Sequence, residues 1–197
     1  MWGSRGSIRI VERRASLILR RRRPAAVSKD APNSSYTPAM ARIRLETRLS
    51  MSPDAARERV LTPALLRHVA APLLVFKPLD PPAFPERWEA GDYRVAVRVF
   101  GFIPIGRQTV GIRFGQTRED APEGAFVVRD EGSGDLMKTW DHWIFIAPHP
   151  DGGTRYIDDV TVKAGWMTPF AGVFARLFYA WRQHRWRGLD RRAAQLD

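Results

Sequence analysis

Asp158 is the residue of this sequence best placed to do chemistry, because it is a carboxylate inside a run of apolar strand residues. Tyr156 and Val160 lie two positions to either side, so the three side chains share one face of an extended strand. Burying a carboxylate on an apolar face is costly unless the group is paired or hydrogen-bonded. Three interpretations stay open: a structural carboxylate held by an arginine or by backbone amides, a group that orients a ligand, or an acid/base with a raised pKa.

A hairpin is predicted to place aromatic side chains beside Asp158. Pro150-Asp151-Gly152-Gly153 separates the predicted strands 139–147 and 154–163, and Asp-Gly is a common two-residue hairpin turn. This turn pairs Asp158 with Phe145 and Val160 with Trp143, and paired residues share a face. The face expected to point inward carries Trp143, Phe145, Tyr156, Asp158, Val160 and Val162. The opposite face is also apolar, with Ile144, Ile146 and Ile157, and stays open as the alternative.

The other reactive residue types form no catalytic or metal-binding pattern. The chain has no cysteine, which excludes disulfides, cysteine-ligated zinc and thiol catalysis. None of the four histidines is spaced as a metal ligand pair, and His142 is interpreted as a surface residue. No phosphate-binding loop or nucleophile motif is present. We therefore predict no metal site, no cofactor and no assigned catalytic residue.

Positive charge is concentrated near the N-terminus. The chain of 197 residues has a net charge of +11, of which residues 1–39 contribute +7, with nine basic and two acidic residues. We expect this segment to be a disordered basic extension and Met40 to be an alternative start, with 40–197 as one domain. A targeting segment, or weak contact with an anionic surface through Arg20–Arg23, stays open. The arginines near the C-terminus, including Arg182, are expected to be solvated, so nucleic-acid binding is not expected.

The remaining pattern indicates an α+β domain. A strand is predicted over 42–49, and Ser52-Pro53 and Thr62-Pro63 are predicted to start two short helices. Further strands are predicted over 73–77, 93–100, 107–114 and 126–130, before the hairpin. The longest stretch without a charged residue, Ala164 to Ala175, has twelve residues, so no integral membrane segment is predicted.

A long amphipathic helix is predicted after the hairpin, with Thr168 as its cap and Gly188 as its end. Its apolar stripe at helical spacing consists of Phe170, Val173, Phe174, Leu177, Phe178 and Trp181. We expect this stripe to lie against the concave face of the sheet and to form both core and cavity roof.

Three stretches of residues 41–189 resemble a known family. They are Ile43–Thr47 with the Ser-Pro-Asp helix start, the hairpin from Trp143 to Thr154, and Thr154–Val160 leading through Ala164-Gly165 into the helix. Together they resemble the START-like and polyketide-cyclase-like superfamily known as SRPBCC. The resemblance implies a helix-grip fold, in which a curved antiparallel sheet of six to seven strands wraps round a long C-terminal helix.

The resemblance also implies a cavity between sheet and helix that binds a hydrophobic or amphipathic small molecule, such as a lipid, a polyketide or an aromatic compound. A cyclase or aromatase-like enzyme is the alternative, and association with a membrane or nucleic acid through the basic arm is a third. A cytoplasmic location is expected, and the oligomeric state is left open. The residues expected to line the cavity are Val97, Val110, Ile112, Trp143, Phe145, Tyr156, Asp158, Val160, Phe174 and Phe178.

Overall fold

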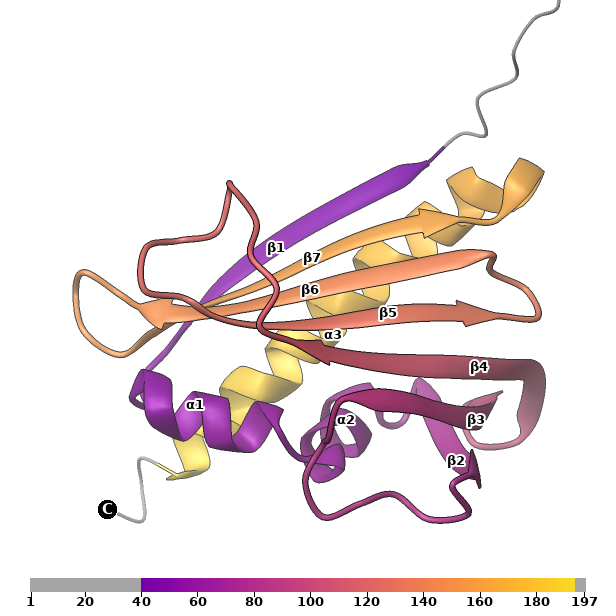
Figure 1. The fold of residues 1–197 in the computed structure, drawn as a ribbon, viewed down its shortest axis with the longest axis horizontal. Coiled ribbons are helices and arrows are strands. Elements are labelled where there is room, and N and C mark those ends of the chain that lie inside the picture. The colour runs from indigo at the N-terminus through magenta and orange to yellow at the C-terminus, as the bar shows by residue number, and fades with distance from the viewer. Residues whose placement is uncertain (1–39, 194–197) are drawn as a thin grey trace, which may run out of the picture. The chain divides into compact units, whose positions relative to one another are not determined.

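A seven-stranded antiparallel sheet is the framework of residues 40–193, the part of the chain that the computed structural model describes (Figure 1). The predicted basic extension, residues 1–39, lies outside the described residues. The strands follow the order β1-β7-β6-β5-β4-β3-β2. Their bounds are β1 (Ala41–Leu49), β2 (Leu74–Asp80), β3 (Gly91–Val99), β4 (Ile103–Phe114), β5 (Phe126–Gly134), β6 (Thr139–Pro148) and β7 (Thr154–Lys163).

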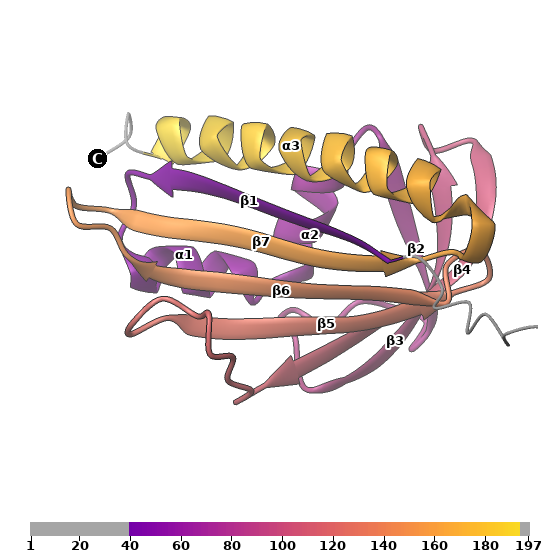
Figure 2. The same ribbon diagram turned by 90° about the horizontal axis from the view of Figure 1, so that it is seen from above.

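Three helices accompany the sheet. The short helices α1 (Pro53–Val60) and α2 (Pro63–Ala70) join β1 to β2, and the turn η1 (Gly165–Met167) leads from β7 into α3 (Thr168–Ala193). Figure 2 shows α3 running alongside β1 for most of its length. The predicted helix-grip architecture, with two short helices after the first strand and a long C-terminal helix, is confirmed.

Both short helices start at the residues that the sequence indicates. Ser52 accepts a hydrogen bond from the amide of Ala55 at 3.2 Å, and Thr62 accepts one from the amide of Leu65 at 3.3 Å. A proline follows each cap, where its missing N–H costs nothing. The two helices are separated only by Leu61 and Thr62. Together they connect β1 to β2, which lies at the opposite edge of the sheet.

The predicted apolar stripe of α3 is wrong in part: Phe178 is buried and Phe174 packs against the core, but three of the other residues point to solvent. Phe170, Val173 and Leu177 are exposed, whereas Ala171 and Ala175 face the sheet. The reason is a close approach between helix and sheet: a Cβ added at Gly172 would lie 2.8 Å from the Cβ of Ala41. Ala171, Gly172 and Ala175 therefore determine which face of α3 is buried, because larger side chains would not fit against the sheet. Toward the C-terminus, the same face consists of Phe178, Tyr179, Arg182, Gln183, Trp186 and Asp190.

Gly188 does not end α3, contrary to the prediction. The helix continues to Ala193 because Asp190 in its last turns is anchored to the corner after β1. The Asp190 carboxylate accepts hydrogen bonds from the amide and hydroxyl of Ser50, both at 2.7 Å, and from the amide of Met51 at 3.0 Å. A tertiary contact therefore outweighs the weak helix propensity of glycine.

The predicted register of the β6–β7 hairpin is also wrong, by one residue. Asp158 pairs with Ile144, and Val160 pairs with His142. The loop is longer than the two residues expected, since the last pair is Pro148 with Thr154. Gly152 and Gly153 both have positive φ, +84° and +77°, which places two left-handed residues in this loop.

Alanine at Gly153 is expected to destabilise the protein by about 2 kcal/mol, against about 1 kcal/mol at Gly152. Both changes impose a left-handed alanine, but only at Gly153 would the new Cβ also collide with the carbonyl oxygen of Leu49. Urea unfolding of Gly153→Ala and Gly152→Ala measures the difference. Equal losses in the two variants would contradict a steric role for the approach of this loop to β1.

Candidate functional site

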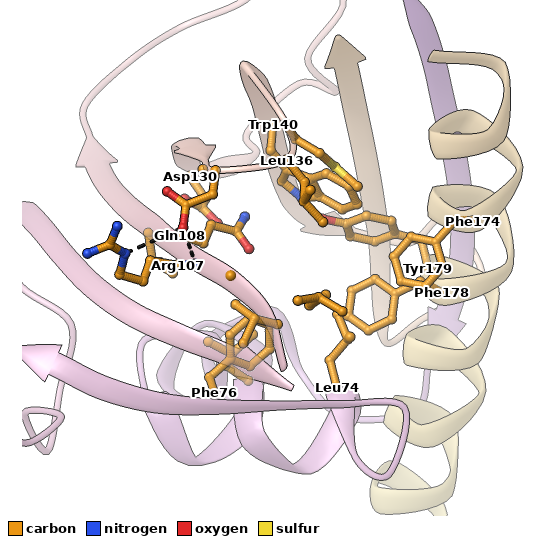
Figure 3. Close-up of a pocket in the computed structure, with 18 of the residues that line it drawn as sticks. Leu74, Phe76, Arg107, Gln108, Asp130, Leu136, Trp140, Phe174, Phe178 and Tyr179 are labelled. Carbon is orange, nitrogen blue, oxygen red and sulfur yellow. Dashed lines mark hydrogen bonds and ion pairs between the residues drawn. The ribbon is translucent and has the colours of Figure 1, made fainter. Parts of the chain in front are cut away.

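A cavity lies between the inner face of the sheet, α2 and the middle of α3. Figure 3 shows Leu74 and Phe76 of β2 opposite Phe174, Phe178 and Tyr179 of α3, with Trp140 beside them. The space in which the centre of a water molecule fits is about 70 Å³. A second space of about 40 Å³ continues it toward Trp88, Val128 and Ile144. Four residues line both spaces: Leu66, Val110, Asp130 and Arg182.

Most of the predicted site residues surround these spaces. Val97, Val110, Phe174 and Phe178 line the larger one, and Val110, Ile112 and Tyr156 line the smaller one. Asp158 lies deeper, in a narrow gap that Tyr156, Arg182 and Trp186 also border. Val160 is fully buried in the hydrophobic core on the same face of the sheet.

Trp143 and Phe145 lie on the opposite face of the sheet, contrary to the prediction. The register shift pairs them with Asp159 and Ile157 and so turns both rings away from Asp158. Guanidinium groups cover these rings: that of Arg118 lies 5.1 Å from the Trp143 ring centre and 5.3 Å from that of Phe145. Arg118 also pairs with Asp159, which Arg42 and Arg44 contact as well. This outer face is therefore closed by ion pairs and cation–π contacts.

Asp158 is held by three side chains. His142 Nε2 lies 2.8 Å from Oδ1, the Tyr156 hydroxyl donates to Oδ1 at 3.0 Å, and Gln183 donates to Oδ2 at 3.1 Å. His142 is buried rather than on the surface as predicted, and burial lowers its pKa despite the neighbouring carboxylate. Burial raises the pKa of Asp158, but the hydrogen bond from His142 and the charge of Arg182 outweigh it and lower that pKa. Asp158 is thus an ionised carboxylate beside a neutral imidazole that donates from Nε2.

Asp130 places a second carboxylate at the cavity. It pairs with Ile112 of β4 and His142 of β6, so its side chain lies on the inner face. Oδ1 accepts a hydrogen bond from the amide of Gly111 at 2.9 Å, at a point where β4 and β5 have no paired residues. Burial among apolar side chains raises the pKa of Asp130 to about 7, and the Gly111 hydrogen bond opposes that rise. This carboxyl group therefore changes its charge near neutral pH.

Arg182 is the cation of the cavity. Only 8% of its surface is exposed, it lines both spaces, and its guanidinium lies 4.9 Å from the ring centre of Tyr179. Burial lowers the pKa of Arg182, but the charges of Asp158, Tyr156, Tyr179 and Asp130 together raise it by more, so the group stays protonated. Its Nε is buried without a hydrogen-bond partner, and among residues 40–193 no carboxylate lies at ion-pair distance from it.

Asp130 and Arg182 are absent from the predicted site, although both lie in sequence patterns that indicate burial. Asp130 follows Phe126 and Val128 at alternate positions, which places a carboxylate on the apolar face of a strand. Arg182 follows Phe178 by four residues and precedes Trp186 by four, so it lies on the same face of a helix as two aromatic residues. Both are charged residues at positions whose neighbours predict burial.

Comparison with known structures identifies the fold. No protein-family model matches the chain, and no curated protein matches it significantly. A protein of Chromobacterium violaceum superposes with a TM-score of 0.52 at 18% identity, over 75% of this chain and 95% of that one. A START superfamily protein of Mycobacterium smegmatis gives 0.52 at 15% identity, over 80% and 99%. The chain therefore shares the helix-grip fold of these two structures.

In a helix-grip fold, the sheet and the C-terminal helix enclose the space described above. Its walls are mostly apolar, with Asp130 and Arg182 at the inner end and Arg107, Gln108 and Asp135 at the outer end, and a mainly apolar lining with a few polar groups is usual for a small-molecule site. Within residues 40–193, no helix combines the length and hydropathy of a membrane span. The same residues contain no group of three or more His, Asp or Glu side chains arranged to hold a metal ion.

Proposed function

We propose that the protein binds a small hydrophobic or amphipathic molecule in the cavity between the sheet and α3. The observation that carries this proposal is the composition of the cavity: Leu74, Phe76, Val97 and Phe178 form apolar walls around a few polar groups. A ligand placed there would exchange water for apolar contact on several sides. A lipid, polyketide or aromatic compound, bound in the cytoplasm, is the ligand class that we propose.

The size of the cavity narrows this class. One water molecule needs roughly 10–15 Å³ of the space open to water centres, so the larger space of about 70 Å³ holds about five waters. Five waters occupy about 150 Å³ in the liquid. A cavity of about that size accepts one benzene ring. A monocyclic aromatic compound or a short aliphatic chain therefore fits between Leu74 and Phe178, and a longer chain would continue past the exposed Leu136 at the outer end.

Two neutral probes, benzamide and 1-octanol, test the proposal on the full chain by isothermal titration calorimetry. We expect saturable binding at a one-to-one ratio, and at least tenfold weaker binding to Val110→Phe, because Val110 lines both parts of the cavity. Val75→Phe is the matched control, since Val75 is 41% exposed and lies outside the cavity wall. Circular dichroism establishes that both variants fold. Equal binding to Val110→Phe and the wild type would overturn the proposal, as would absence of binding by these probes and by their carboxylate counterparts, benzoate and octanoate.

A cyclase or aromatase-like enzyme is the second candidate, and Asp130 favours it. A carboxyl group with a pKa of about 7 in an apolar cavity can both donate and accept a proton near neutral pH. Asp158 and Tyr156 are less suited to that role, because Asp158 is already occupied by three donors and Tyr156 is one of them. To test this candidate, any co-purifying ligand is isolated and incubated with the wild type and with Asp130→Asn, and its mass is then measured. A ligand whose mass is unchanged by both proteins excludes turnover.

A further inference from the structure

Arg182 is a buried cation that the described part of the chain does not neutralise by direct contact. Its guanidinium carbon lies 4.9 Å from the ring centre of Tyr179 and 5.9 Å from that of Phe178. The charge of Asp158 is the largest single contribution that raises the pKa of Arg182. The carboxylate oxygens of Asp158, however, accept hydrogen bonds from His142, Tyr156 and Gln183. The Nε–H of this protonated guanidinium is fully buried without an acceptor, and leaving such a donor unpaired is costly.

The unpaired donors border the cavity. Arg182 lines the larger space, the smaller space and the narrow gap beside Asp158, more of these spaces than any other residue. Tyr179 lines the larger space with it and accepts a hydrogen bond from Trp140 Nε1 at 3.0 Å. The hydroxyl proton of Tyr179 has no acceptor among residues 40–193. Two donors, one of them charged, thus lie at the inner end of a mainly apolar space that Asp130 also borders.

Resting on the proposed function, we infer that the ligand is an organic anion whose carboxylate binds Arg182 while its apolar part lies between Phe178, Leu74 and Val97. A carboxylate matches the planar guanidinium with two parallel hydrogen bonds. The cavity volume sets the remainder of the molecule at about one aromatic ring or a short aliphatic chain. Asp130 borders the same space, and because burial raises its pKa, it accommodates the added negative charge by taking up a proton.

Calorimetry with matched probes on the full chain tests the inference. Benzoate and benzamide have nearly the same shape and differ in charge. Octanoate and 1-octanol have aliphatic chains of the same length, and only the octanoate head group is charged. We expect each acid to bind the wild type at least about tenfold more tightly than its neutral partner, because a charge-assisted bidentate pair forms only with the acid. Benzylamine, a cation of similar size, is expected to bind more weakly than benzamide.

Arg182→Gln is the decisive variant, and Arg176→Gln is its control. Arg176 lies on the same helix, is exposed and lines no cavity, so its replacement changes the net charge equally. We expect Arg182→Gln to lose at least tenfold in benzoate affinity with benzamide changed by less than about twofold, and Arg176→Gln to change neither. Thermal melting establishes that both variants fold.

The two ways of failing are distinguishable. If neutral and acidic probes bind wild type equally, or if Arg182→Gln keeps its preference for benzoate, the inference is wrong while the proposed function stands. If no probe of either charge binds, the proposed function is wrong and the inference falls with it. Tighter benzoate binding that Arg176→Gln weakens as much as Arg182→Gln would indicate attraction by net charge alone, which also overturns the inference.

Discussion

Replacing Asp158 by asparagine is expected to lower the free energy of unfolding by about 3 kcal/mol, because three buried hydrogen bonds lose their charged acceptor. The carboxylate accepts from His142, Tyr156 and Gln183, and it supplies the main negative charge that stabilises the protonated Arg182. An asparagine amide would present N–H groups to donors and would leave the Arg182 charge uncompensated. Urea unfolding at pH 7 measures the loss.

The pH dependence of that loss has a defined sign. The pKa of Asp158 is lowered in the folded state, so its ionised form contributes stability at neutral pH. That contribution disappears as the pH falls through the folded pKa. We therefore expect the difference between wild type and Asp158→Asn to be largest near neutral pH and to shrink in acid.

The double variant Asp158→Asn/Arg182→Gln is the control for this prediction. If the loss reflects an isolated buried cation, removal of Arg182 recovers at least about 1 kcal/mol relative to Asp158→Asn alone. Strictly additive losses would contradict the coupling. The benzamide affinity of Asp158→Asn separates the structural role from the ligand-orienting role, two of the three that the sequence leaves open. Large destabilisation with unchanged affinity supports a structural role, whereas loss of affinity in a stable variant supports direct contact with a ligand.

Local signals were sufficient for the architecture. Alternation over Ala41–Leu49, Ser-Pro and Thr-Pro caps, and the run of short strands each depend on neighbouring residues, and each is present in the structure. From β2 to β7 each strand pairs with the next one along the chain, and pairing of consecutive strands then fixes the order of this part of the sheet. Only the return of β1 to the far edge, beside β7, requires contact between residues far apart in the sequence.

The hairpin face and the helix face failed for a different reason. In the hairpin, a shift of the strand pairing by one residue changes which side chains point inward. In the helix, a rotation by one residue changes which side chains are buried. The local sequence pattern determines neither. Strands β6 and β7 are apolar on both faces, so alternation gives no phase, and the loop length alone sets the register. In α3, large apolar residues occur on two sides, and close approach at Gly172 selects the side with alanines.

Arg182 and Asp130 were missed because charge was taken as a sign of exposure. Five arginines near the C-terminus fit a solvated face, yet Arg182 occupies the helical position between Phe178 and Trp186. Its burial depends on compensation by Asp158, which comes from another element. The sequence of α3 alone does not show that Asp158 lies near Arg182. The alternation in β5 and the i to i+4 spacing in α3 do indicate that Asp130 and Arg182 lie on inward-facing positions.

Asp130→Asn is expected to stabilise the protein by about 3 kcal/mol at pH 8 and by less than about 1 kcal/mol at pH 4. Burial raises the folded-state pKa of Asp130 to about 7, so folding above its ordinary pKa requires either proton uptake or a buried charge. This penalty grows as the pH rises from about 4 to about 7. Asparagine carries no charge, and its side-chain oxygen still accepts the hydrogen bond from Gly111. Urea unfolding across pH 4–8 measures the difference.

Asp135→Asn is the matched control at the outer end of the same cavity. The Arg107 amide, followed by the Arg107 guanidinium, lowers the pKa of Asp135, so its carboxylate favours folding where it is ionised. Its replacement is therefore expected to reduce stability at pH 8 relative to pH 4, opposite in sign to Asp130→Asn. If both variants shift in the same direction, net charge rather than burial governs the effect. If Asp130→Asn parallels the wild type from pH 4 to pH 8, Asp130 is a solvated carboxylate and cannot serve as the proton-accepting partner of an anion bound at Arg182.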